Sequence, residues 1–319
     1  MTPEKFIERI FINDKRAVAR AISIIESDNS NSTEILKELH KKIGRAYRIG
    51  ITGPPGAGKS TLTNQLTKYY RKQNKKVGII AVDPTSPFTG GALLGDRVRM
   101  SEVGSDSGVF IRSMATRGSL GGLSKKTIDA ADVLDAAGYD FIIFETVGVG
   151  QSELDVARAA DTTIVVLVPE SGDSIQAMKA GLMEIADFFV LNKSDRPGSE
   201  SAMVALKTIL MLRDHTEKSW LPNIIKAVAS ENSGTKEIAD EIERHHNYLE
   251  QNGLLKEKRE SNYKVRIKEI VEHLLKNELW KEERAKSLEA SLAKVVEGET
   301  SPYQIAETLF NDFKSTIQQ

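Results

Sequence analysis

The stretch Ile51–Leu62, ITGPPGAGKSTL, decides the fold of this chain. Inside it, Gly53–Ser60 matches G-x-x-x-x-G-K-S/T, with an apolar run, YRIGIT, before it and a helical run, TLTNQLTKYYRK, after it. Glycines let the backbone wrap closely, so that its N–H groups can point at phosphate oxygens. The helix that starts near Gly58 directs its positive end toward the same anion. The stretch therefore predicts a strand, a phosphate-binding loop and a helix, rather than a Gly/Pro turn without a ligand.

The last two residues of the pattern have defined chemical roles. Lys59 supplies a point charge for the β- and γ-phosphates, and the hydroxyl of Ser60 is a ligand for Mg²⁺. We therefore expect the chain to bind a nucleoside triphosphate together with Mg²⁺.

The base is indicated by Phe188–Asp195, FFVLNKSD, an apolar strand that ends in N-K-x-D. The carboxylate of Asp195 can accept hydrogen bonds from N1–H and the 2-amino group of guanine, and adenine has no such pair of donors. Asn192 and the aliphatic stem of Lys193 would fix the loop and cover the ring. The alternative is a loop with a capping Asp, but the order downstream of the phosphate loop favours guanine.

A second loop that contacts the base is expected after the run KAVA. It would consist of Ser230, Glu231 and Asn232. A strand followed by a polar turn explains these residues about equally well.

The middle of the chain carries the candidate residues for hydrolysis. The strand FIIF is followed by Glu145, with Gly148 three residues later, where ordinary GTPases have Asp-x-x-Gly. The longer Glu145 side chain should still reach the shell of the metal. Gln151 could orient the attacking water, or it could be an ordinary residue of a polar loop.

Two further carboxylates are candidate Mg²⁺ ligands, because this ion prefers oxygen ligands and keeps several waters. Asp83 ends the predicted strand Val77–Val82, beside the strand of the phosphate loop, and Asp96 lies in GALLGDRVRM. Asp83 could instead be a turn residue before Pro84, and Asp96 could be a charge on a helix surface. We favour a metal role for Asp83, whereas the two interpretations of Asp96 are balanced.

Composition excludes several classes of protein. The chain has 319 residues, 40% hydrophobic and 28% charged, with a net charge of −1, so no overall field attracts nucleic acid or an anionic membrane. No apolar run approaches the roughly 18 residues of a membrane-spanning helix, and the N-terminus has no apolar signal core. The chain has no cysteine, which excludes disulfides and thiolate metal sites and fits a cytoplasmic location.

The order of patterns predicts an α/β fold with a doubly wound, mostly parallel sheet and helical extensions at both ends. We expect an N-terminal helical extension (1–46), a P-loop GTPase domain (47–252) and a C-terminal helical arm (253–319). The apolar stripe Ile267–Leu279 could be a dimer interface or an internal core. The predicted strands are Tyr47–Thr52, Val77–Val82, Val109–Arg112, Phe141–Phe144, Thr163–Val168, Phe188–Leu191 and Ile224–Val228.

Several blocks, in this order, resemble one family: GPPGAGKST, VDPTSPFTGGALLGDRVRM, RGSLGGLS, ETVGVGQSE, ESGDSIQAMKAG and NKSD. It is the MeaB/ArgK family, the G-protein chaperones of adenosylcobalamin-dependent acyl-CoA mutases, which includes the methylmalonic aciduria type A protein. The resemblance implies a homodimeric SIMIBI-class GTPase whose C-terminal arm helps dimerisation. It also implies a partner, methylmalonyl-CoA mutase or isobutyryl-CoA mutase. Family members gate loading of adenosylcobalamin into the mutase and protect or reactivate it.

The resemblance also implies roles for individual residues. The Mg²⁺ environment would be Ser60, Asp83, Asp96 and Glu145, and guanine would be bound by Asn192, Lys193 and Asp195. The phosphates would be bound by Gly53, Pro54, Pro55, Gly56, Ala57, Gly58, Lys59, Ser60 and Thr61.

A mobile switch is implied for Glu170–Leu182, whose Lys179 could swing toward the nucleotide when the partner binds, or could be an ordinary surface lysine. We predict slow intrinsic hydrolysis of GTP that the partner accelerates. The candidate catalytic residues are Lys59, Asp83, Glu145, Gln151 and Lys179.

Other functions are less favoured by the sequence. A kinase acting on a lysine/arginine/ornithine transport system, as the older family name claims, would need an acceptor pocket, and N-K-x-D argues against the use of ATP. A nickel-insertion GTPase needs clustered His or Cys ligands, and His245–His246, the only His pair in the sequence, is expected on a solvated helix face. Direct cobalamin binding is not expected, because the sequence has no Asp-x-His-x-x-Gly segment.

Overall fold

The computed structural model describes residues 2–27, 31–84, 101–116, 122–146, 152–169, 180–211 and 219–317. Its contacts divide the chain into two compact units, Met1–Arg259 and Glu260–Gln319. The predicted boundaries at 46/47 and 252/253 stay predictions.

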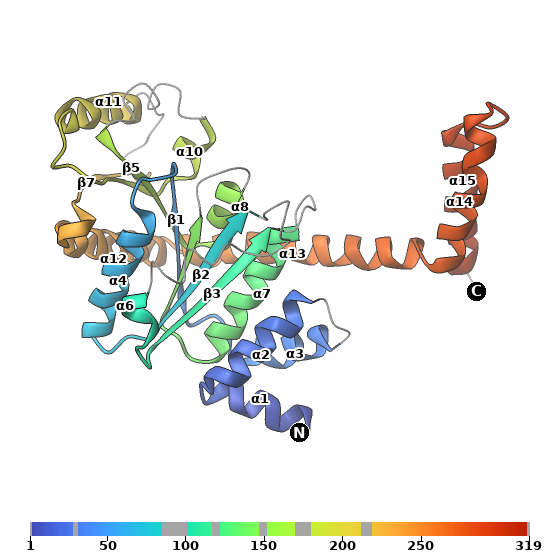
Figure 1. Cartoon of the computed structure of the whole chain (residues 1–319), viewed down its shortest axis with the longest axis horizontal. Helices are drawn as coiled ribbons and strands as arrows, with labels where there is room; N and C mark the ends of the chain where they lie inside the picture. Colours follow the sequence, from blue (N-terminus) through green and yellow to red (C-terminus); the bar gives the residue numbers. More distant parts are fainter. Residues whose placement is uncertain are drawn as a thin grey trace. The chain divides into compact units, whose positions relative to one another are not determined.

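The first unit is built on a seven-stranded sheet in which every neighbouring pair of strands is parallel (Figure 1). The strand order is β3-β2-β4-β1-β5-β6-β7. The strands are β1 (Tyr47–Thr52), β2 (Val77–Pro84), β3 (Val109–Thr116), β4 (Phe141–Thr146), β5 (Thr162–Leu167), β6 (Phe188–Leu191) and β7 (Ile224–Lys226). The predicted α/β fold with a parallel, doubly wound sheet is confirmed.

The strand bounds differ from the predicted ones mainly at the carboxyl ends. β2 and β3 run past Val82 and Arg112, because the two strands pair along their whole length up to Pro84 and Thr116. β7 ends at Lys226, and Val228 forms an antiparallel bridge with Ser233 instead of extending the strand. A turn therefore replaces the last residues of the predicted strand Ile224–Val228.

Helices cover both faces of the sheet. The helices α4, α6 and α12 pack on one face, with buried Leu62, Leu66 and Ile238 against strand residues such as Ile49. The helices α7, α8, α10 and α11 pack on the other face. The helices of this unit are α1 (Pro3–Phe11), α2 (Lys15–Glu26), α3 (Ser32–Leu39), α4 (Lys59–Lys72), α6 (Ser101–Gly104), α7 (Gly122–Ala136), α8 (Ser152–Ala159), α10 (Ala180–Ile185), α11 (Ser199–Met211) and α12 (Thr235–Gln251), with 3₁₀ turns η1 (His40–Lys42) and η3 (Ala229–Glu231).

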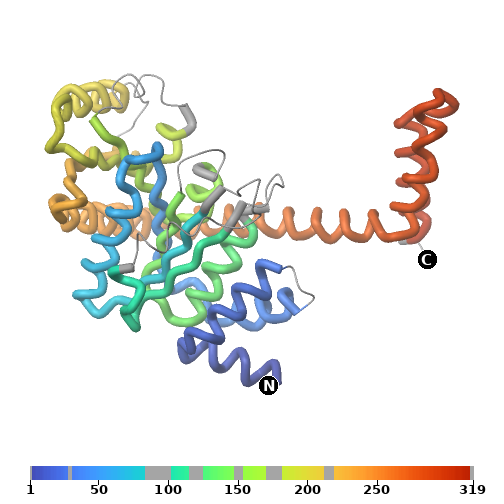
Figure 2. Tube along the Cα trace, viewed as in Figure 1, coloured from blue at the N-terminus to red at the C-terminus, as the bar shows by residue number. Residues whose placement is uncertain are grey.

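The N-terminal helices α1–α3 pack against α7 and extend the core outward from the sheet (Figure 2). Asp14 caps α2, because its carboxylate accepts hydrogen bonds from the N–H groups of Arg16 and Ala17. Ile10, Val18 and other apolar residues of these helices are fully buried. The predicted helical character of the N-terminal segment is therefore confirmed.

Buried acids join the amino ends of the strands to the rest of the unit. Asp135 on α7 accepts a hydrogen bond from Gly44 N–H at 2.7 Å. Asp161, just before β5, accepts from Arg48 N–H and pairs with the guanidinium of Arg259, whose Nη2 lies 2.7 Å from the carboxylate. These ion pairs and backbone contacts satisfy the buried carboxylates and fix the start of β1 opposite the edge that carries the phosphate loop.

The second unit contains helices α14 (Glu282–Val296) and α15 (Pro302–Ile317), and the boundary between the units falls within α13 (Leu254–Leu279). Ser301 and Gln304 form a reciprocal capping box at the start of α15. The apolar stripe of α13 is largely exposed in this chain, at Ile267, Val271, Leu274 and Leu275. An apolar stripe of this kind is typical of a surface that another chain covers.

His245 corrects one expectation from the sequence. It is only 2% exposed, although a solvated helix face was expected for His245–His246. Its Nδ1 lies 2.7 Å from the hydroxyl of Thr162, and the indole of Trp220 packs against its ring. The face of α12 that carries His245 therefore points at the sheet, which the local pattern did not reveal.

The close packing of β1 against α8 gives a stability prediction. A Cβ added at Gly50 would lie 2.9 Å from Cγ1 of Val156, a distance that forces the helix or the strand to shift. We expect Gly50→Ala to lower the free energy of unfolding by about 1–3 kcal/mol through overpacking. Urea unfolding measures it, with Gly104→Ala as control, because the nearest atom to a Cβ there is 3.9 Å away. Equal stability of the two variants would contradict the packing argument.

The buried histidine gives a pH prediction. Burial lowers the pKa of His245, and Lys258 and Arg244 lower it further, whereas Asp187 and Glu241 oppose the shift. Below the unfolded pKa of about 6.5, the unfolded chain binds a proton that the folded chain excludes, so stability falls as the pH falls. We expect Tm to decrease between pH 7 and pH 5, and less steeply in His245→Gln. A His245→Gln slope equal to that of wild type would refute the argument.

Candidate nucleotide-binding site

The phosphate loop lies between β1 and α4 and depends on two glycines. Gly53 has φ +136° and Gly58 has φ +90°, a region that other residues rarely adopt. A Cβ at Gly53 would lie 2.1 Å from the carbonyl oxygen of Val166, and one at Gly58 would lie 2.2 Å from Nδ2 of Asn192. The loop is therefore fitted closely against β5 and against the loop after β6.

Positive charge is concentrated where α4 begins. The Lys59 amine donates to the carbonyl oxygens of Gly53 and Pro54, at 2.8 and 2.9 Å, and the residue is 5% exposed. In the first turn of α4, Leu62 N–H donates to Gly58 O, and the amino end of a helix favours an anion. This arrangement suits the phosphates predicted to bind here.

Oxygen ligands meet beside the same helix start. The hydroxyl of Ser60 donates to the carboxylate of Glu145, a buried residue near the carboxyl end of β4 that lies beside Ile51 of β1. Asp83 belongs to the carboxyl end of β2, the other neighbour of β4. A hydroxyl and a carboxylate in contact are oxygen ligands of the kind that Mg²⁺ prefers, so Ser60 and Glu145 fit the ion. Within the ranges that the structure describes, no three His, Asp or Glu side chains form a ready metal cluster.

A hydrogen bond that sequence reasoning missed joins β1 to β4 at this edge. The hydroxyls of Thr52 and Thr146 lie 3.0 Å apart, and both residues are fully buried. Thr52 precedes the phosphate loop, and Thr146 follows Glu145. The contact depends on the adjacency of β1 and β4, which are separated by about 90 residues of sequence, so no local signal could have identified it.

The N-K-x-D segment contacts the phosphate loop directly. Nδ2 of the buried Asn192 donates to Ala57 O at 2.8 Å, and Oδ1 accepts from Ala229 N–H at 3.0 Å. The Lys193 amine donates to Gly56 O at 2.8 Å. Asp195 is exposed at the surface of the same loop. This placement agrees with Asn192 and Lys193 as loop-fixing residues and leaves the Asp195 carboxylate accessible to a base.

The second predicted base loop is a tight turn after β7. Val228 and Ser233 exchange two backbone hydrogen bonds, at 3.1 and 3.2 Å, which close the turn at its base. Its tip consists of the exposed residues Ser230, Glu231 and Asn232. The structure therefore brings this tip and the N-K-x-D loop together through Ala229. The predicted residues Asp96, Gln151 and Lys179 lie outside the described residues.

The topology explains why these loops meet. Adjacent strands β1 and β4 send their following helices, α4 and α8, to opposite faces of the sheet. Ligands of open parallel sheets bind at the carboxyl ends of strands at such a switch point. The phosphate loop follows β1, the N-K-x-D segment follows β6, and Glu145 lies near the carboxyl end of β4, all at this edge. Fold and motifs together define the class of P-loop GTPases.

The chain belongs to the family described as methylmalonyl-CoA mutase-associated GTPase MeaB, whose family model matches residues 18–284. A protein of Pyrococcus abyssi, named only as a GTPase, is 47% identical over 97% of this chain and 96% of its own length. GTPase ArgK of Escherichia coli is 35% identical over 85% of this chain and 86% of its own length. The methylmalonic aciduria type A homolog of Mus musculus is 32% identical over 98% of this chain and 80% of its own length.

A solved structure supports the same assignment. The crystal structure of an LAO/AO transport system kinase covers 99% of this chain and 97% of its own, with a TM-score of 0.71 and 28% identity. The protein is therefore a guanine-nucleotide-binding protein that hydrolyses GTP. Among the described residues, no helix has the length and apolar character needed to cross a membrane.

Proposed function

We propose that this GTPase is a chaperone of an adenosylcobalamin-dependent acyl-CoA mutase, which gates loading of the cofactor and protects or reactivates the mutase. The observation that carries the proposal is the match to the mutase-associated family over residues 18–284, most of the chain. The mouse relative, named for methylmalonic aciduria, supports the same class of client. The client would be methylmalonyl-CoA mutase or isobutyryl-CoA mutase, and the cobalamin would be held by the mutase rather than by this chain.

The described residues would divide the work of binding GTP. Gly53–Thr61 would hold the phosphates, with the Lys59 amine placed against their negative charge. Asp195 would accept two hydrogen bonds from guanine, beside a loop that Asn192 and Lys193 hold against the phosphate loop. The position of each loop at the carboxyl edge of the sheet supports these proposed roles.

Mg²⁺ would be held by Ser60, Glu145, Asp83 and Asp96, of which Ser60 and Glu145 already contact each other. When bound, the ion supplies positive charge to the β- and γ-phosphate oxygens. Gln151 would orient the attacking water, and Lys179 would reach the nucleotide when the partner binds. We propose that the intrinsic rate is slow, because both residues would act fully only in the complex with the partner.

The second unit would serve dimerisation. Several large apolar residues of α13 are exposed, including Ile267, Leu274 and Leu275. Covering such a stripe with the same stripe of a second copy would stabilise a homodimer.

The alternative function is a kinase acting on a lysine/arginine/ornithine transport system. It is favoured by the structural similarity to a protein that is named as an LAO/AO transport system kinase. The proposed pairing of Asp195 with guanine argues against ATP as the phosphoryl donor, and a labelled-phosphate transfer assay separates the two functions.

The guanine assignment is tested by Asp195→Asn. The variant loses a charged acceptor for two donors of guanine, so we expect kcat/KM for GTP to fall about 10- to 100-fold. Xanthosine triphosphate, which has a 2-oxo group, should become the better substrate. Asp240→Asn, an exposed acid on α12, is the control and should behave like wild type. An unchanged preference for GTP in Asp195→Asn would place the base elsewhere.

The chaperone role is tested by turnover of GTP and ATP, with and without an adenosylcobalamin-dependent mutase from the same organism. We expect slow GTP hydrolysis that rises severalfold with the mutase, no ATP turnover, and loss of the stimulation in Lys179→Ala. Fast hydrolysis without the mutase, or no response to it, would contradict the proposal while leaving the GTP site intact.

A further inference from the structure

The turn that follows β7 is closed by its own backbone hydrogen bonds, but its position in the site depends on contacts with other parts of the chain. The paired backbone groups of Val228 and Ser233 make its base rigid, and Asn232 at its tip has φ +57°. Such a turn moves as one body. Backbone hydrogen bonds of Ala227 with Leu191 and Ser194 hold the chain just before the turn. Within the turn, Ala229, the buried first residue of η3, makes the contacts with other parts of the site.

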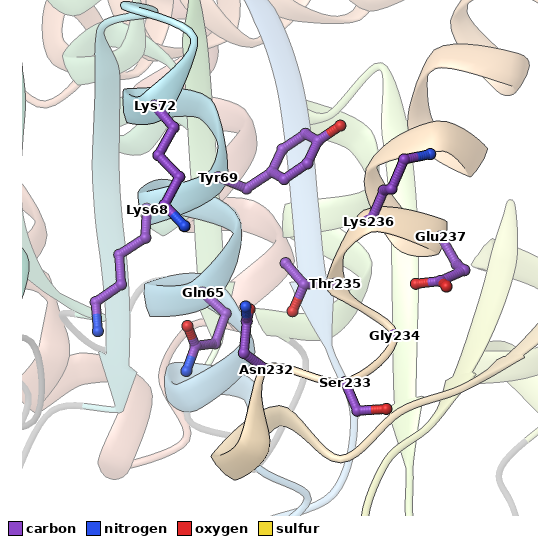
Figure 3. Close-up of a pocket in the computed structure, with 10 residues that line it drawn as sticks. All are labelled: Gln65, Lys68, Tyr69, Lys72, Asn232, Ser233, Gly234, Thr235, Lys236 and Glu237. Atoms are coloured by element: carbon purple, nitrogen blue, oxygen red, sulfur yellow. The ribbon is translucent and has the colours of Figure 1, made fainter.

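Both backbone groups of Ala229 bond to side chains from other parts of the site. Its N–H donates to Oδ1 of Asn192 at 3.0 Å, and its carbonyl oxygen accepts from Nε2 of Gln65 at 3.1 Å. Gln65 lies on α4, the helix that begins at the phosphate loop. Figure 3 shows Gln65 on this helix beside the segment that carries Asn232.

The hydrogen bonds of Asn192 and Gln65 together link the turn after β7, the phosphate loop and α4. Asn192 donates to Ala57 in the phosphate loop and accepts from the N–H of Ala229. Gln65, on the helix that follows the phosphate loop, donates to the carbonyl oxygen of the same Ala229. The turn is therefore connected to both ends of the segment 57–65, to Ala57 through Asn192 and to Gln65 directly. The amide orientations are consistent, because each amide nitrogen meets a carbonyl oxygen and the Asn192 oxygen meets an N–H.

The exposed tip of the turn faces an opening next to α4, although Ala229 itself is buried in the same apolar core as Leu62 and Leu66 of that helix. A pocket of about 360 Å³ opens between α4 and the segment 232–237. Its walls include Gln65, Tyr69 and Lys72 from α4 and Asn232 from the tip of the turn (Figure 3). The tip therefore borders open space, and the Gln65 hydrogen bond is a polar contact between α4 and the turn beside that space.

We infer that Gln65 is a positioning residue of the guanine site, which sets the place of the Ser230–Asn232 tip and thereby the rate at which nucleotide is released. The inference rests on the proposed assignment of this tip to the base. Gln65 does not contact the nucleotide; it acts through the carbonyl of Ala229. Its loss should let the turn swing away from α4, which opens the side of the site where guanine would lie.

The test is the release rate of a fluorescent mant-GDP from the full chain and from two variants. Gln65→Glu keeps the shape of the side chain but turns the donor into an acceptor that faces a carbonyl, and Gln65→Leu removes the polar group. We expect release to accelerate about fivefold in Gln65→Leu, the scale of one neutral hydrogen bond, and more in Gln65→Glu. KM for GTP should rise with it, while kcat at saturating GTP stays close to wild type.

The matched controls are Gln73→Glu and Gln73→Leu, at the exposed C-cap of the same helix, which should release mant-GDP at the wild-type rate. Wild-type release in both Gln65 variants would overturn the inference. A loss of kcat together with a lower Tm would overturn it as well, because it would indicate general damage to α4. If Asp195→Asn changes base preference while the Gln65 variants do not change release, the guanine site stands and only the role of Gln65 fails.

Discussion

The side-chain amide of Asn192 is the connection on which the geometry of the site depends. Its two hydrogen bonds join the phosphate loop to the turn after β7, and they do so in a place that is 2% exposed. Breaking either one would leave a backbone group buried without a partner, which costs far more than an exposed hydrogen bond is worth. Three segments from distant parts of the sequence are thus held as one surface. A ligand that spans phosphate loop and base loop meets a surface that is already assembled.

The sheet supplies the frame for this surface. Because the strands are parallel, the carboxyl ends of β1, β4 and β6 lie at one edge of the sheet. The pairing of β1 with β4 places Glu145 beside the start of α4. At the opposite edge, Asp135 and Asp161 satisfy backbone N–H groups at the start of β1. The strand is therefore fixed at its amino end, and its carboxyl end carries the glycines that a phosphate can approach. The contacts that stabilise β1 thus lie at its amino end, and the candidate binding residues lie at its carboxyl end.

Much of this fold could be predicted, because its signals are local. The strands Tyr47–Thr52 and Phe188–Leu191 have the predicted bounds, since each is an apolar run that stops at a motif with its own chemistry. The parallel sheet followed from the alternation of strands and helices. The placement of the loop residues 53–61 and 192–195 agrees with their motifs, and their roles in binding stay predictions.

The remaining features depend on strand order and helix rotation, which local patterns do not contain. The contacts between Thr52 and Thr146 and between Gln65 and Ala229 link residues about 90 and about 160 positions apart. The burial of His245 depends on which face of α12 meets the sheet, and a polar residue pair gives no sign of that face. β7 is shorter than predicted because Val228 pairs with Ser233 in the following turn. Each miss is a case in which a tertiary contact decided between alternatives that the sequence left equal.

A crystal structure of the full chain with GDP and Mg²⁺ tests the central claim most directly. We predict that Asn192 keeps both of its hydrogen bonds, that the Asp195 carboxylate lies within hydrogen-bonding distance of N1 and the 2-amino group of guanine, and that the diphosphate occupies the loop at the start of α4. A base placed away from Asp195, or an Asn192 side chain turned out of its contacts with Ala57 and Ala229, would contradict the account.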